Sequence, residues 1–71
     1  MSNELTNEEK ANVLNNLIKN IKLTKYQVEQ EILAEQNSSN PSQGWIDQAS
    51  IQIKILVEKI NYLENKLDNL L

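Results

Sequence analysis

The sequence predicts an all-α fold, a two-helix antiparallel hairpin of the coiled-coil type. This prediction depends on two apolar repeats, one in each half of the chain, and on the single short turn-forming segment between them. Because apolar residues at alternating spacings of three and four share one face of a helix, each repeat indicates an α-helix with one side to be covered. The 71 residues allow one small domain, expected at 6–71 behind an N-terminal tail at 1–5.

The first helix is expected at about residues 7–36. Thr6 can cap its N-terminus, and Glu9 can bond back to Thr6 to complete a capping box. The apolar stripe that follows consists of Ala11, Leu14, Ile18, Ile21, Val28 and Ile32, and it is widened by Leu17, Tyr26 and Leu33. Lys25 interrupts the stripe, but its aliphatic stem can lie along the seam while its ammonium group reaches water.

The connection is expected at residues 37–41, within the only stretch of the chain that is rich in turn formers. This stretch contains the single proline, Pro41, which suits the first turn of a new helix because its missing N–H costs nothing there. Asn40 is then the expected N-cap, with Gln43 at the reciprocal position. A helix that starts one or two residues later, from Ser42, is nearly as favourable.

The second helix, expected at about 42–70, has the most regular pattern. Four consecutive heptads carry apolar residues at their a and d positions: Ile46, Ala49, Ile53, Leu56, Ile60, Leu63, Leu67 and Leu70. Residues 51–55 alternate as a β-strand would, but four heptads outweigh five residues of alternation. Each helix would be roughly 45 Å long at about 1.5 Å per residue. Equal lengths and a short connection favour antiparallel pairing of the two helices.

The second helix has more apolar surface than one partner helix covers, because Ile51, Ile55 and Tyr62 fall on its outer positions and Trp45 and Val57 flank the seam. An exposed apolar patch of this size is typical of an interface. We therefore expect a homodimer that forms a four-helix bundle, or a larger oligomer. The residues expected at the oligomer or partner interface are Trp45, Ile46, Ile53, Ile55, Leu56, Ile60, Tyr62, Leu63, Leu67 and Leu70.

The sequence leaves open which helix covers the seam. Ile at a and Leu at d favour parallel pairing between two chains, which would place Lys59 opposite Glu64 of a second copy. The first helix of the same chain could equally cover it. Trp45 also has two interpretations. It is either a plug that closes the end of the core, which we favour, or an aromatic anchor for a partner.

The composition disfavours most kinds of catalytic and metal-binding site. Cysteine and histidine are absent, which excludes disulfides, ordinary zinc sites and the usual nucleophile–base pairs, so we expect no enzyme, no cofactor and no metal. The net charge is −3 and every positive charge is a lysine, so we expect no nucleic-acid binding. The longest apolar run, residues 55–57, is too short to cross a membrane, and the polar N-terminus is unlike a signal peptide. We expect a cytoplasmic protein.

Two charged clusters are the remaining candidate sites. Three carboxylates lie near the end of the first helix: Glu29, Glu31 and Glu35. Such a group can bind a cation, although a solvated acidic face is the favoured interpretation. Three lysines at spacings of three, with a tyrosine beside them, form a basic line: Lys19, Lys22, Lys25 and Tyr26. In an oligomer this line could bind a phosphorylated ligand or nucleotide, and its plainer interpretation is a solubilising flank.

The segments Leu5-Thr6-Asn7-Glu8-Glu9-Lys10 and Lys25-Tyr26-Gln27-Val28-Glu29, with the closing heptads, carry a resemblance. The chain resembles short uncharacterised helical-hairpin proteins encoded by tailed bacteriophages. The resemblance implies a small phage accessory protein, in the virion or in the host cytoplasm, and it carries over no catalytic or ligand residues. We expect a non-enzymatic structural or interaction protein that binds copies of itself and a larger phage or host protein. The alternative is an oligomeric protein that sequesters a small phosphorylated ligand or nucleotide.

Overall fold

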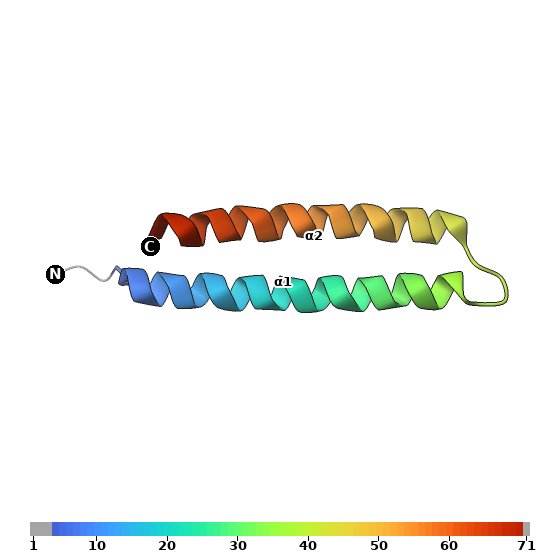
Figure 1. Cartoon of the computed structure of the whole chain (residues 1–71), viewed down its shortest axis with the longest axis horizontal. Helices are drawn as coiled ribbons and strands as arrows, with labels where there is room; N and C mark the ends of the chain where they lie inside the picture. Colours follow the sequence, from blue (N-terminus) through green and yellow to red (C-terminus); the bar gives the residue numbers. More distant parts are fainter. Residues whose placement is uncertain (1–3, 71) are drawn as a thin grey trace.

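The structure is a computed structural model that describes residues 4–70, so the expected N-terminal tail is described only at residues 4 and 5. The described residues form two helices, α1 (Asn7–Gln36) and α2 (Gln43–Leu70), which a turn at 37–42 joins. The helices lie side by side and antiparallel, with the start of α1 and the end of α2 at the end opposite the turn (Figure 1). The hairpin measures 61 × 18 × 14 Å. The predicted all-α hairpin is confirmed.

The N-terminus of α1 is closed by a capping box between Thr6 and Glu9, as predicted. The backbone N–H of Glu9 donates to Thr6 Oγ1 at 3.1 Å, and the backbone N–H of Thr6 donates to Glu9 Oε1 at 2.9 Å. The bond from the Thr6 backbone, and after it the bond with the Thr6 side chain, hold the pKa of the Glu9 carboxyl below its ordinary value of 4.5. The first turn of α1 therefore keeps a carboxylate where the helix dipole favours one.

The C-terminus of α1 is tied to the start of α2 through Glu35. Asn37 caps α1, and its Nδ2 donates to the carbonyl oxygen of Leu33 at 2.7 Å. Ser38 Oγ donates to the backbone oxygen of Glu35 at 2.7 Å. The Glu35 side chain then crosses the turn, and its Oε2 accepts the backbone N–H of Ser42 at 2.9 Å. One residue thus joins the last turn of α1 to the cap of α2.

The N-terminus of α2 is capped by Ser42, so the expected cap at Asn40 is wrong and the later start is correct. The backbone N–H of Trp45 donates to Ser42 Oγ at 3.3 Å, which satisfies one of the orphan donors of the first turn. Gln43 does not bond back to a cap, because its Nε2 donates to Asp47 Oδ1 at 2.8 Å.

The core is a single seam between the helices. Its buried residues are Ile18 and Val28 of α1 and Ile46, Ala49, Leu56 and Ile60 of α2. The seam of α2 is therefore covered by α1 of the same chain, which decides the pairing that the sequence left open. Residues 51–55 are helical, so their strand-like alternation has no structural consequence. Lys25 lies half-buried along the seam, and its Nζ donates to Glu29 Oε2 at 3.2 Å.

Candidate interaction surfaces of the hairpin

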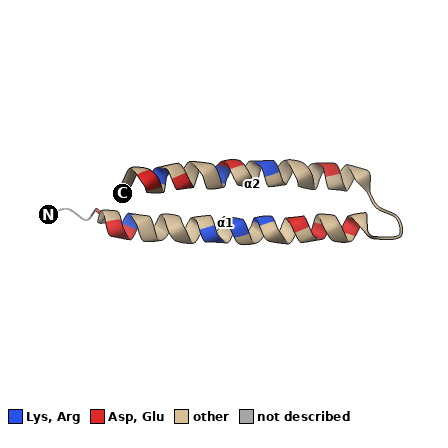
Figure 2. Ribbon diagram, in the orientation of Figure 1, with Lys and Arg blue, Asp and Glu red and all other residues tan. Residues whose placement is uncertain are grey.

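The a positions of α1 are Ala11, Ile18, Lys25 and Ile32, and those of α2 are Ile46, Ile53, Ile60 and Leu67. Positions a and d point toward the other helix, position f points away from it, and the remaining positions form two long faces on either side of the seam. Positions c and g of both helices form one side, which we call the Leu17 face. Positions b and e form the other, which we call the Tyr26 face. Figure 2 shows that charge is unevenly spread along α1, with lysines in its middle and acidic residues toward the turn.

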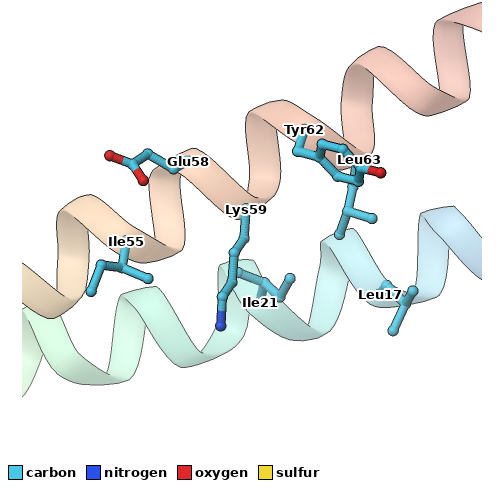
Figure 3. Close-up of a pocket in the computed structure, with 7 residues that line it drawn as sticks. All are labelled: Leu17, Ile21, Ile55, Glu58, Lys59, Tyr62 and Leu63. Atoms are coloured by element: carbon cyan, nitrogen blue, oxygen red, sulfur yellow. The ribbon is translucent and has the colours of Figure 1, made fainter.

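The centre of the Leu17 face is an open apolar groove of about 460 Å³. Its lining residues are Leu17 and Ile21 of α1 and Ile55, Glu58, Lys59, Tyr62 and Leu63 of α2 (Figure 3). Three of these are well exposed, with fractions of 44% for Leu17, 46% for Ile55 and 60% for Tyr62. The Nζ of Lys66 lies 5.7 Å from the centre of the Tyr62 ring, a cation–π contact at the groove's end.

Toward the turn, the Leu17 face continues as a second groove with a different lining. Its residues are Thr24, Gln27, Val28, Glu31, Trp45, Gln48, Ala49 and Gln52. Half of them are polar without charge, so they can form hydrogen bonds with a partner at a lower desolvation cost than charged groups would have. Trp45 is 40% exposed here, so it is not the buried plug that the sequence favoured.

On the Tyr26 face, Lys22, Lys25 and Tyr26 line one groove together with Glu29, Val57 and Ile60. The structure thus brings together three of the four predicted anion contacts, and Lys19 is not among the residues of this groove. Both lysines already have carboxylate partners. Lys22 Nζ lies 3.6 Å from Glu64 Oε2, and Lys25 Nζ lies 3.2 Å from Glu29 Oε2. Glu64 therefore forms its ion pair within the chain, with Lys22 and not with Lys59 of a second copy.

The predicted interface residues divide into two groups. Seven of them lie in the seam, buried or half-buried: Ile46, Ile53, Leu56, Ile60, Leu63, Leu67 and Leu70. The other three, Trp45, Ile55 and Tyr62, are exposed on the Leu17 face. This second group is the more exposed to another chain, although Leu63 of the first group also lines the central groove. Leu17 is not among the residues that the sequence predicts at the interface, although it directly precedes the seam residue Ile18 and so falls at a g position.

The carboxylates of the predicted acidic cluster do not converge. Glu29 pairs with Lys25, Glu35 accepts the Ser42 N–H, and Glu31 lines the groove beside Trp45. Within residues 4–70, no three acidic side chains are grouped as a metal site requires.

Neither helix of the described chain combines the length and the apolar character that crossing a membrane requires. Comparisons of the chain with protein-family models, curated proteins and solved structures find no match.

Proposed function

We propose that this protein is a non-enzymatic interaction protein that associates with copies of itself through the outer apolar surface of the hairpin. The observation that carries this proposal is the apolar surface left after the seam is closed. Among residues 4–70, eleven large hydrophobic side chains remain exposed, in a chain of 8.2 kDa. Surfaces of this kind mark protein–protein contacts.

The thinness of the core supports the same proposal. No described side chain is less than 2% exposed, because two helices alone cannot surround a residue on all sides. Chains of this size usually need disulfides, a metal or oligomerisation to be stable. This chain has no cysteine or histidine for the first two. Burying an exposed Leu, Ile or Val contributes roughly 1.5–3 kcal/mol, so association is the effective remedy.

The biological setting follows from the resemblance to phage-encoded hairpin proteins. We place the protein as a phage accessory or virion-associated component, in the host cytoplasm or the particle, whose further partner is a larger phage or host protein. That partner would bind the assembled oligomer.

Light scattering coupled to size exclusion tests the proposed self-association. At roughly 10–100 µM, the expected mass is at least twice the 8.2 kDa of one chain, and the apparent dissociation constant should be micromolar or tighter. Circular dichroism on the same samples reports whether the chain is helical. A helical monomer throughout this range would contradict the proposal.

One observation favours a second function, the binding of a small phosphorylated ligand or nucleotide. Lys22, Lys25 and Tyr26 share one groove, where two ammonium groups and an aromatic ring could hold a phosphate and a base. The cost is that Glu29 and Glu64 already pair with these lysines, so a ligand must displace both carboxylates. This competition places the ligand-binding function second.

A further inference from the structure

We propose that the Leu17 face is the contact surface of a symmetric homodimer, in which two hairpins lie face to face with their turns at opposite ends. This inference rests on the proposed self-association and adds which face is used and how the copies are oriented. It follows from the unequal charge of the two faces and from the order of residues along the Leu17 face.

The Leu17 face is the less charged and more apolar of the two. Its c and g positions carry four charged residues: Lys10, Glu31, Lys59 and Lys66. The b and e positions of the Tyr26 face carry eight charged residues within the helices. Five large apolar side chains lie on the Leu17 face: Val13, Leu17, Trp45, Ile55 and Tyr62. Because charged groups are depleted from the centres of interfaces and aromatic residues are enriched there, the Leu17 face is the better contact surface.

The g positions of α1 complement themselves when two copies run antiparallel. In order along the helix they are Lys10, Leu17, Thr24 and Glu31. If α1 of one copy packs against α1 of the other in the opposite direction, Lys10 faces Glu31 and Leu17 faces Thr24. The two-fold axis then passes close to Ile21, with Lys10 and Glu31 roughly 15 Å on either side at about 1.5 Å per residue.

The same axis also suits α2. Ile21 lines the central groove together with Glu58 and Lys59, so these residues lie near the axis. An axis between Glu58 and Lys59 places Lys59 of each copy beside Glu58 of the other. It also brings Ile55 of one copy onto Tyr62 of the second copy. One axis therefore produces two kinds of opposite-charge pair and one apolar pair, which is the isologous complementarity that a two-fold interface requires.

The alternative dimer, with both turns at the same end, is less favourable. In it α1 of one copy lies on α2 of the other, and residues at the same level meet. Lys10 and Lys66 of both copies then gather at the open end of the bundle, where like charges repel. Opposite orientation avoids this and centres both hairpins on the groove, so the faces overlap along nearly the whole length of the helices, roughly 45 Å at about 1.5 Å per residue. At 18 Å wide, such a face has about the 800 Å² that each partner contributes to a standard interface.

Cysteine cross-linking tests the orientation directly, because the natural chain has no cysteine. Lys10→Cys and Glu31→Cys chains are prepared separately, mixed and oxidised. The expected product is the mixed disulfide between the two variants, with little Lys10→Cys homodimer because these positions lie at opposite ends. The matched control is a mixture of Glu8→Cys and Glu29→Cys chains, with equal spacing on the Tyr26 face, which should not cross-link.

A charge placed in the groove provides a second test. Leu17→Glu should weaken association at least roughly tenfold, since it buries an unpaired carboxylate at the centre of the contact. Leu23→Glu makes the same change at a position that is 60% exposed and outside both faces, and should leave association unchanged. Circular dichroism confirms that both variants remain helical.

The outcomes separate this inference from the proposed function. If the wild-type chain is oligomeric but only the Glu8→Cys and Glu29→Cys variants cross-link, the choice of face is overturned. Normal association of the Leu17→Glu variant would overturn it as well. Preferential disulfides between a Lys10→Cys chain and a Lys66→Cys chain, which face each other when both turns lie at the same end, would overturn the orientation. A monomeric wild-type chain would overturn both proposals and leave the Leu17 face to a different partner.

Discussion

Lys22 and Glu64 form an ion pair that links the two helices, with Lys22 Nζ 3.6 Å from Glu64 Oε2. Both residues occupy e positions, which meet in an antiparallel pair of helices. The pair therefore agrees with the hairpin topology. The Glu64 carboxylate is therefore paired with Lys22 of its own chain, and not with Lys59 of a second copy as in a parallel coiled coil.

This ion pair should contribute little stability. The two side chains are 57% and 46% exposed, so solvent screens their attraction. A double-mutant cycle with Lys22→Ala and Glu64→Ala should give a coupling free energy of at most about 1 kcal/mol. Urea unfolding followed by circular dichroism, at one fixed protein concentration, measures it. A coupling of several kcal/mol would show that the pair is desolvated, for example by a second chain.

The seam should carry most of the stability of the hairpin. Leu56 is 8% exposed, and Leu56→Ala should lower the free energy of unfolding by roughly 2–5 kcal/mol through lost burial and the resulting cavity. The matched control is Leu23→Ala, because Leu23 is 60% exposed and should lose well under about 1 kcal/mol. Thermal melts of both variants provide the comparison, and equal losses would contradict the assigned seam.

Lys25 should be the weak point of that seam. It is the lysine in the stripe of α1, and its side chain is 30% exposed while it donates to Glu29. Lys25→Leu should raise the free energy of unfolding by about 1 kcal/mol, because an apolar side chain is buried there at no desolvation cost. Lys19→Leu, at an exposed position, should bring no such gain. A lower melting temperature for Lys25→Leu than for the wild type would show that the ion pair contributes more than an apolar side chain.

The capping box should make the stability of α1 sensitive to acid. The pKa of Glu9 is lower in the folded chain than its ordinary 4.5, because the carboxylate accepts the Thr6 N–H. Its stabilising effect is therefore complete above the ordinary pKa and is lost as the pH falls through the lowered value.

Two variants test this sign. Glu9→Gln keeps a hydrogen-bond acceptor but does not titrate, so it should lose less stability than the wild type when the pH falls below about 4.5. Thr6→Ala should lose about 1 kcal/mol near neutral pH through the missing cap. Melting temperatures measured across the acid range provide both results. An identical acid profile for the wild type and Glu9→Gln would refute the capping contribution.

The ligand-binding alternative predicts a thermal shift. If Lys22, Lys25 and Tyr26 bind a phosphorylated ligand, cyclic or linear nucleotides at about 100 times the dissociation constant should stabilise the chain by roughly 2.7 kcal/mol. Lys22→Ala and Lys25→Ala should each abolish most of the shift. Lys54→Ala, a lysine outside this groove, serves as the control. No shift with any nucleotide tested, or a shift that both groove variants retain, would reject this function.

The helices and their N-terminal cap follow from local sequence. Heptad spacing places apolar residues on one face within each helix, and the Thr6–Glu9 box involves residues three apart, so both features are decided within a few turns. The start of α2 was harder to predict, because two caps were locally plausible. In the structure α2 starts after Ser42. The backbone N–H of Ser42 donates to the carboxylate of Glu35, which belongs to the other helix.

Which apolar residues are buried in the seam and which stay exposed was decided only by the tertiary structure. The sequence identified a seam in α2 but could not decide whether α1 or a second chain covers it, because the same heptad pattern suits both. Once α1 covers that seam, Leu17, Ile55 and Tyr62 gather on one outer face and Trp45 is left exposed there. Periodicity within a helix determines which side is apolar. Only the packing of one helix on the other determines which apolar residues remain for a partner, because that depends on their relative direction and rotation.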